Sequence, residues 1–342
     1  MNLIAQDVIK SPELRVGALL LGGRAFLAPL SGVTDVGMRR AAQHFGASMV
    51  VSEMVAADAY VAADEEARLR AEGTGLSPHV VQIAGRCPAM LAEAARLAEA
   101  AGADAIDINM GCPAKRVVGG YAGSALMREP DLAVALVRAV VAVVRVPVTV
   151  KMRLGWDDAN RNAPVLAAQL EGEGAAMITV HGRTRMQFYK GKADWEAISA
   201  VRDRISVPLV ANGDCQGPAD ARAMLAQSGA DAVMIGRSAV GRPWLVGAVA
   251  NALAGRSATP PSASARREAA LAHYDSLLST MGAASGVRHA RKHLVAYARA
   301  ADEDGFAVGQ ATATRLTTSD DPGEVAQLLA NLWDEPLAKA AA

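Results

Sequence analysis

Residues 104–115 read Asp-Ala-Ile-Asp-Ile-Asn-Met-Gly-Cys-Pro-Ala-Lys, an apolar run followed by a glycine–proline turn that carries a cysteine. The run from Asp104 to Met110 predicts a buried parallel strand, and a parallel barrel places its reactive groups in the turns after such strands. A thiol with a pKa near ~8.5 is mostly protonated at neutral pH, so Cys112 could donate a proton. The commoner role of a free cysteine is that of a small buried hydrophobe, and this stretch alone leaves both interpretations open.

Seven more apolar runs flank this one, and longer stretches rich in alanine and leucine separate them. Each run is continuous rather than alternating in polarity, as in parallel strands that are buried on both faces. Eight strand–helix units over this length predict a (β/α)8 TIM barrel of the α/β class. An open doubly wound sheet would need a glycine-rich dinucleotide fingerprint after its first strand, and none is found. The predicted strands are 24–30, 49–54, 79–84, 104–109, 147–153, 176–181, 208–212 and 231–236.

The composition is that of an ordinary globular protein of 342 residues, with 51% hydrophobic residues and a formal net charge of zero. Cys87, Cys112 and Cys215 lie far apart without a C-x-x-C pair, so we expect no metal site and no disulfide. Reduced thiols, together with the lack of a signal-peptide pattern, favour a cytoplasmic location. No apolar run reaches the ~18 residues of a membrane span. A nucleic-acid partner would need a local basic patch, since the chain has no overall charge.

The C-terminal part of the chain has a different pattern. Residues 254–264 are rich in Ser, Ala and Pro and predict a linker. It would join a barrel domain at residues 1–253 to an all-helical domain at residues 265–342. In that helical domain Arg288, Arg291, Lys292 and Arg299 follow a spacing that puts them on one helix face. Such a face could meet RNA phosphates, or it could be an ordinary solvated surface.

Polar residues recur at the ends of the predicted strands, and a barrel brings these ends to one mouth. A lysine or glutamine inside a strand is costly to bury unless it is paired, so the recurrence indicates a shared site. Glycine-bearing turns after the last two strands form the usual phosphate cradle of this fold, and Arg237 suits a phosphate dianion. A simple strand-to-helix turn is the alternative for Gly236 and Arg237. Gln82 could bind the polar edge of a planar ring and Lys151 could neutralise its charge, which describes FMN. The strand-end residues are Pro29, Leu30, Ser31, Gln82, Asn109, Lys151, Arg153, His181, Asn212, Gly213, Asp214, Gly236 and Arg237.

Several motifs resemble those of the tRNA-dihydrouridine synthases, and most closely the bacterial B-type branch. They include residues 27–35 (Leu-Ala-Pro-Leu-Ser-Gly-Val-Thr-Asp), 107–115, 150–156 (Val-Lys-Met-Arg-Leu-Gly-Trp) and 181–185 (His-Gly-Arg-Thr-Arg). The resemblance covers about residues 10–300. Where the family usually has Ala-Pro-Met-Ala-Gly this chain has Leu30 and Ser31, and leucine keeps an apolar contact beneath the ring. Residues 302–319 fit the family pattern poorly.

The resemblance implies an enzyme that uses FMN and NADPH to reduce the C5–C6 bond of particular uridines in folded tRNA. It implies that the strand-end residues named above, apart from Asn109 and Arg153, hold FMN. Asn109 would contact the uracil, and Cys112 would protonate C5 after hydride arrives at C6 from flavin N5. The target base would have to leave its stack, at a cost of a few kcal/mol. The helical domain, with Arg288, Arg291 and Lys292, would bind the tRNA body through phosphate contacts.

Two other functions stay open. A flavin barrel that acts on a small pyrimidine such as dihydroorotate would share the phosphate cradle and the lysine. It would not need the basic helical domain or a cysteine acid in this turn. A non-catalytic RNA-binding barrel should have lost Cys112 or Lys151, and both are present.

Overall fold

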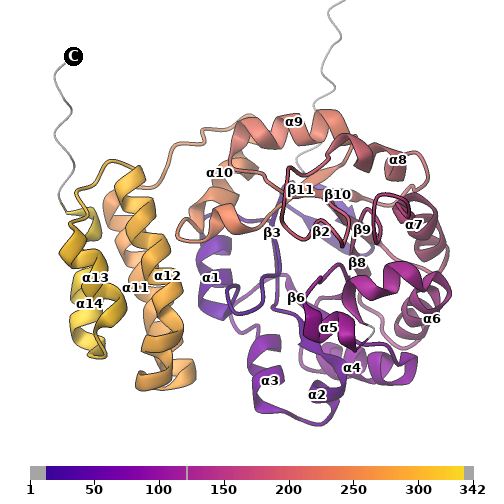
Figure 1. The fold of residues 1–342 in the computed structure, drawn as a ribbon, viewed down its shortest axis with the longest axis horizontal. Coiled ribbons are helices and arrows are strands. Elements are labelled where there is room, and N and C mark those ends of the chain that lie inside the picture. Colours follow the sequence, from indigo (N-terminus) through magenta and orange to yellow (C-terminus); the bar gives the residue numbers. More distant parts are fainter. Residues whose placement is uncertain (1–12, 121, 335–342) are drawn as a thin grey trace, which may run out of the picture.

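The computed structural model describes residues 13–120 and 122–334, so the predicted domain ends at residues 1 and 342 lie outside the described residues. Parallel strands form a closed ring surrounded by helices, and a further group of helices packs against one side of it (Figure 1). This architecture is the predicted TIM barrel with a C-terminal helical region. No helix of the described part is both long and apolar enough to cross a membrane.

The ring has eight strand positions and closes where β4 pairs with β6. The short β5 also pairs with β6, so β4 and β5 share one position. Seven of the strands lie within predicted apolar runs, β7 ends one residue beyond its run, and β5 follows the run at 49–54. The strands are β3 (Ala25–Leu27), β4 (Met49–Val51), β5 (Val55–Ala56), β6 (His79–Ala84), β7 (Ala105–Met110), β8 (Val148–Arg153), β9 (Met177–His181), β10 (Leu209–Asn212) and β11 (Ala232–Ile235).

Strand side chains alternate between two apolar layers, which explains why the runs are continuous in sequence. Phe26 and Val80 belong to a cluster inside the ring. Their neighbours Leu27 and Val81 belong to the larger core between the strands and the surrounding helices. The barrel is therefore a packed core, and its polar residues are left for the strand ends.

Helices cover the outside of the ring. Several have proline in the first turn, where its missing N–H is not needed and its fixed φ suits the helix. These are α4 (Pro88–Ala100), α6 (Pro130–Val141), α7 (Ala163–Gly172) and α9 (Pro218–Ser228). The other α-helices around the barrel are α1 (Val36–His44), α2 (Ala57–Val61), α3 (Glu65–Ala71), α5 (Lys115–Gly119), α8 (Ser199–Arg202) and α10 (Trp244–Leu253).

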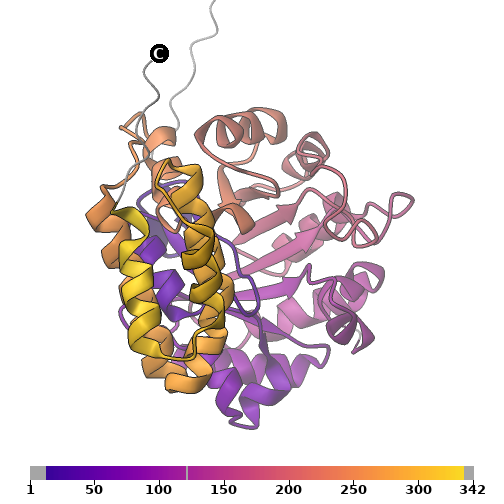
Figure 2. The same ribbon diagram turned by 60° about the vertical axis from the view of Figure 1, so that its left-hand side comes forward.

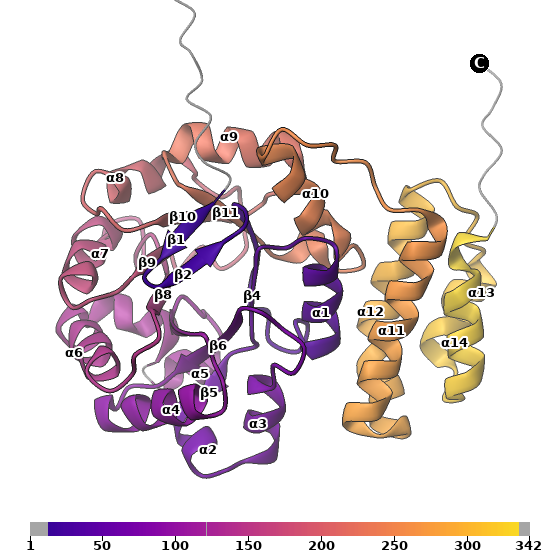
Figure 3. The ribbon, with the colours of Figure 1, turned by 180° about the vertical axis from the view of Figure 1, so that it is seen from behind.

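A hairpin of β1 (Leu14–Val16) and β2 (Leu19–Leu21) lies across one end of the barrel, as seen from behind in Figure 3. Its Val16 and Leu21 are buried in the same cluster as Phe26, so the hairpin covers the inner core. The sequence did not predict this element because strands of three residues are too short to show a polarity pattern.

The C-terminal region consists of α11 (Ala263–Met281), α12 (Ala283–Glu303), α13 (Gln310–Thr318) and α14 (Pro322–Ala330). Figure 2 shows them as a bundle, and Figure 1 shows that bundle beside α1 and α10. Tyr274, Tyr297 and Trp333 are buried in one cluster with Trp244 of α10, so the bundle and the barrel share this core. The first helix begins two residues before the predicted boundary at 265, because Ser262 caps it by accepting a hydrogen bond from Ala265 N. The division into two domains stays a prediction.

Candidate active site

A cavity of about 1360 Å³ opens at the carboxyl ends of the strands. It is lined by Cys112 together with every one of the strand-end residues predicted from the sequence. Ala296, Arg299 and Glu303 of α12 form part of its wall, so the helical region borders the barrel mouth. Arg288, Arg291 and Lys292 do not line the cavity. The structure thus separates the predicted site into a mouth and an outlying face of α12.

The turn that carries Cys112 is held on both sides. Cys112 N donates a hydrogen bond to Asn109 Oδ1 (2.9 Å), and Ser124 Oγ donates to Cys112 O (2.9 Å). Arg153 Nε donates to the carbonyl of Gly111 (2.7 Å). The thiol is half-buried at the cavity wall. These contacts fix the backbone of the turn and hold Cys112 at the cavity wall.

A buried carboxylate that the sequence analysis missed orients the polar groups of the mouth. Asp107 is paired in register with Gln82 on one side and Thr149 on the other. Gln82 Nε2 donates to Asp107 Oδ2 (2.7 Å), and Thr149 Oγ1 donates to Asp107 Oδ1 (2.6 Å). Gln82 Oε1 is therefore left to accept from Asn109 Nδ2 (2.8 Å), which turns Asn109 Oδ1 toward Cys112 N. Burial raises the pKa of Asp107, and the hydrogen bonds from Gln82 and Thr149 oppose that shift.

Lys151 of β8 lines the mouth, and its ammonium is hydrogen-bonded to a side chain of β10. Its Nζ donates to Asn212 Oδ1 (2.9 Å), and Asn212 Nδ2 donates in turn to the carbonyl of Met234 (2.8 Å). Burial, with the charge of Arg153 nearby, lowers the pKa of Lys151 to about 8. Such an ammonium gains stability when an anionic group comes close to it, because that group compensates for lost solvation.

The turn after β10 packs closely against the imidazole that ends β9. Gly213 has φ +119°, and a Cβ there would lie 2.9 Å from the His181 ring and 2.7 Å from Ala193, so only glycine fits. Burial, with Lys151 and Arg153 nearby, holds the pKa of His181 well below its ordinary value, so the imidazole is neutral at pH 7. A neutral imidazole can both donate and accept hydrogen bonds.

Asp214 joins two arginines at the edge of this turn. The fully buried Arg183 makes a two-point contact with its carboxylate (2.6 and 2.9 Å), and the exposed Arg237 lies 3.2 Å away. Burial raises the pKa of Asp214, but the hydrogen bonds from Arg183 and Ala193 N outweigh it and leave the pKa below its usual value. Arg183 was seen only as part of a motif, since its partner lies 31 residues away. Arg237 donates to Asp214 through Nη2 alone and its side chain is exposed, so its other N–H groups can bind an anion.

On the outer face of α12, Arg288, Lys292 and Arg299 are exposed along one line, with Val295 between the last two. Arg291 does not follow that line fully, because its guanidinium pairs with Asp320 (2.7 Å) in the turn between α13 and α14. Arg299 reaches the cavity wall. The basic face therefore starts at the barrel mouth and runs away from it along α12.

The family described as Dihydrouridine synthase (Dus) matches residues 26–332. The chain belongs to this family. The predicted resemblance is thereby confirmed, and the match takes in both the barrel mouth and most of the helical region.

Relatives within the dihydrouridine synthase family match nearly end to end. The protein named "Probable tRNA-dihydrouridine synthase" of Rhizobium leguminosarum bv. phaseoli is 50% identical over 313 residues, which are 91% of this chain and 95% of that protein. The one named "tRNA-dihydrouridine synthase B" of Xanthomonas axonopodis pv. citri is 44% identical over 309 residues, 90% of this chain and 92% of that protein.

Solved structures of other barrels resemble the chain in fold. Histamine dehydrogenase from Rhizobium sp. 4-9 aligns with a TM-score of 0.53 and 14% identity, over 70% of this chain and 47% of that one. The crystal structure titled TcOYE with pHBA aligns with a TM-score of 0.54 and 15% identity, over 75% of this chain and 96% of that one. At such identities the likeness shows the barrel fold alone.

Proposed function

We propose that this chain is a tRNA-dihydrouridine synthase that uses FMN and NADPH to reduce the C5–C6 bond of particular uridines in tRNA. The observation that carries the proposal is the fixed Cys112 turn, which shares one cavity with the polar residues expected to hold the flavin. Membership of the dihydrouridine synthase family and the names of the relatives support it. A tRNA substrate also agrees with the expected cytoplasmic location.

The residues of the mouth fit FMN by their chemistry. The backbone N–H groups of the turns at Gly213 and Gly236, together with the exposed guanidinium of Arg237, suit a phosphate dianion. The half-buried Lys151 suits a ring that gains negative charge on reduction, and His181 and Asn212 would support it from the neighbouring strands. Pro29, Leu30 and Ser31 would contact the ring from the end of β3, with Gln82 at its polar edge. FMN, when bound here, supplies the hydride that NADPH delivers to it.

The uracil would be handled by Asn109 and Cys112. Asn109 Oδ1 accepts from Gly111 N and Cys112 N, and one N–H of Asn109 Nδ2 donates to Gln82 Oε1. Asn109 would therefore position the turn and would present its remaining N–H to the base. Cys112 Sγ would hold the proton that goes to C5 and would regain one from solvent. The half-buried position of the thiol at the cavity wall supports this role.

The basic face of α12 would hold the tRNA while the target base enters the mouth. Arg288 and Lys292 are exposed, and Arg299 joins their face to the cavity wall. Phosphate contacts of this kind position a nucleic acid without reading its sequence. They would also help to offset the few kcal/mol needed to take the base out of its stack.

The test is dihydrouridine formation by the purified, FMN-loaded protein. Unmodified tRNA and NADPH are supplied without oxygen, and dihydrouridine is counted per tRNA. We expect about one or a few per tRNA, in a reaction that free uridine does not support. Reduction of a free pyrimidine such as orotate, with no product in tRNA, would favour the small-pyrimidine alternative. A protein that binds tRNA but carries no flavin would favour the non-catalytic one.

A further inference from the structure

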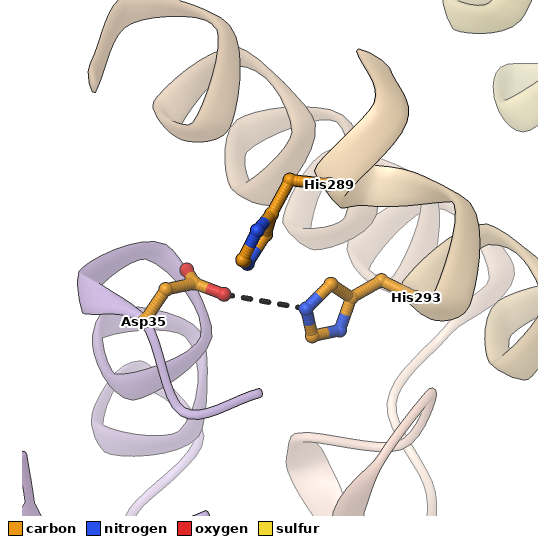
Figure 4. A group of neighbouring side chains, drawn as sticks. All are labelled: Asp35, His289 and His293. Atoms are coloured by element: carbon orange, nitrogen blue, oxygen red, sulfur yellow. Dashed lines mark ion pairs between the residues drawn. The ribbon is translucent and has the colours of Figure 1, made fainter. Parts of the chain in front are cut away.

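Two histidines of α12 face an aspartate at the start of α1 (Figure 4). His289 and His293 are four residues apart and so project from one side of the helix. Asp35 is the N-cap of α1, and its carboxylate lies 3.3 Å from His293 Nε2. One possible ligand atom from each of the three side chains lies within 4.8 Å of the other two. The cluster spans the junction between the helical region and the barrel.

His293 is the unusual member of this cluster. Only 2% of it is exposed, yet neither ring nitrogen makes a hydrogen bond of acceptable geometry. Leaving a buried polar group without a partner costs about 1–3 kcal/mol, so buried groups of this kind normally have one. The ring is thus buried beside the other two side chains with a nitrogen left over for a ligand bond.

We propose that Asp35, His289 and His293 bind a divalent transition-metal ion, with Zn²⁺ the best match, and that this ion fastens α12 to α1. Two imidazoles and one carboxylate are an ordinary ligand set for zinc, and water completes the coordination. Two histidines at i and i+4 on a helix form a chelating pair. The cysteine spacing predicted no metal site, but that argument does not detect ligands so far apart in the sequence.

The distances require only a small adjustment. Zinc bonds of about 2.0–2.2 Å place tetrahedral ligands about 3.4 Å apart, close to the observed separation of Asp35 and His293. His289 is half-buried, and its ligand nitrogen lies within 4.8 Å of the other two ligand atoms, so its side chain would move closer to them when an ion binds.

Further contacts orient the carboxylate. Met38 N donates to Asp35 Oδ1 (3.1 Å), and His273 Nε2 lies 3.2 Å from Asp35 Oδ2. His273 Nδ1 is in turn 3.0 Å from the hydroxyl of Tyr297. Metal-binding carboxylates are commonly held by a second set of hydrogen bonds of this kind, which fixes their direction.

Lys292 competes with the metal. Its ammonium lies 2.9 Å from His289 Nε2 and adds positive charge beside the site. The lysine is exposed, so its side chain can swing into solvent when an ion binds. Removing the ammonium should therefore tighten metal binding several-fold, an outcome specific to this arrangement.

The test is a Zn²⁺ titration of the FMN-loaded protein after treatment with a chelator, in competition with a zinc indicator dye. Wild type should take up one Zn²⁺ that His289→Ala binds at least tenfold more weakly, and Zn²⁺ should raise the melting temperature of wild type but not that of His289→Ala. His44→Ala, an exposed histidine of α1, is the matched control and should bind like wild type. His289→Ala keeps the buried His293 and all three thiols, so any zinc bound by cysteine is the same in this variant and in wild type. FMN content shows that the variant is folded.

Lys292→Ala provides the second arm, with tighter Zn²⁺ binding than wild type expected. Equal affinity in wild type and His289→Ala would overturn the proposal, since the ion would then lie on thiols or elsewhere. No stoichiometric uptake by wild type would overturn it as well, and would leave Asp35 and the histidines as a metal-free polar junction.

Discussion

The barrel mouth and the outer face of α12 hold their polar groups in opposite ways. In the mouth, Asp107, Gln82 and Asn109 are buried and bind one another through bonds of 2.7–2.8 Å. On α12, Arg288 and Lys292 are exposed, and their contacts are with near neighbours on the same helix, Ser285 and His289. Proton and hydride transfer needs groups fixed before the substrate arrives, whereas phosphate binding needs only charge and reach. Changes in the mouth should therefore alter rates, and changes on α12 should alter affinity.

The largest effect is expected at Cys112. Cys112→Ala should bind FMN and oxidise NADPH as wild type does, but should form dihydrouridine roughly 10²–10⁴-fold more slowly, because a general acid contributes about that much. The measurement is the rate of dihydrouridine formation beside the rate of NADPH oxidation. A variant that makes dihydrouridine at the normal rate would remove Cys112 from the role of acid.

Asp107→Asn should slow uridine reduction by about 10–100-fold, because a hydrogen bond to a charged group contributes about 1.5–3 kcal/mol. The amide nitrogen introduced at position 107 can donate to Gln82 Oε1. That oxygen would then no longer accept the hydrogen bond from Asn109 Nδ2. Thr149→Val is the matched control: it removes the other contact with Asp107 but leaves Gln82 in place. Rates of dihydrouridine formation should fall in the order wild type, Thr149→Val, Asp107→Asn. An equal loss in both variants would mean that Asp107 matters for stability alone.

Lys151→Met should slow flavin reduction by NADPH by about tenfold, because a cation near the ring stabilises the charge of the reduced form. Stopped-flow absorbance of the flavin measures this rate. A wild-type rate with normal FMN content would place the Lys151 ammonium away from the ring.

The same variant has a pH signature in the protein without FMN. The pKa of Lys151 is about 8 in the folded chain and ~10.4 in the unfolded one. Between these values the unfolded state binds more protons, so this group makes the folded state more stable as pH rises. From pH 8 to 10, wild type should gain stability relative to Lys151→Met in urea unfolding. A constant difference would show that the ammonium is well solvated.

The smallest effects are expected on α12. Neutralising Arg288, Arg291 and Lys292 together should weaken tRNA binding and reduce its salt dependence, by about one unit of slope for each phosphate that is no longer neutralised. Arg291→Ala alone should do least, because that guanidinium is already paired with Asp320. Binding isotherms at several salt concentrations measure both quantities, with FMN content as the control for folding. Equal affinity and parallel slopes would make this face an ordinary solvated surface.

The sequence predicted those parts of the molecule that depend on local pattern and on barrel topology. Continuous apolar runs located the ring strands, and closure of the ring then brought the strand-end residues from Pro29 to Arg237 into one cavity. The β1–β2 hairpin was missed because its strands are too short for a pattern. Family resemblance supplied the chemistry, which the spacing of residues alone left open.

Contacts between distant segments could not be predicted from the sequence. The role of Asp107 depends on its register against β6 and β8, and an aspartate within an apolar run was the only signal. The pairing of Arg291 with Asp320, and the meeting of Asp35 with His293, depend on how α12 packs against other segments. Helical spacing predicts a shared face, but it does not say what that face meets.

Single-turnover reoxidation of the reduced flavin by tRNA tests the central claim most directly, because one curve of rate against tRNA concentration yields both a plateau and a half-saturation point. The account predicts that Cys112→Ala lowers the plateau at least a hundredfold and leaves half-saturation unchanged. It predicts that the triple variant at Arg288, Arg291 and Lys292 moves half-saturation to higher tRNA concentration and keeps the plateau. The reverse pattern, or a loss of both quantities in both variants, would contradict a division between chemistry in the barrel mouth and tRNA binding on α12.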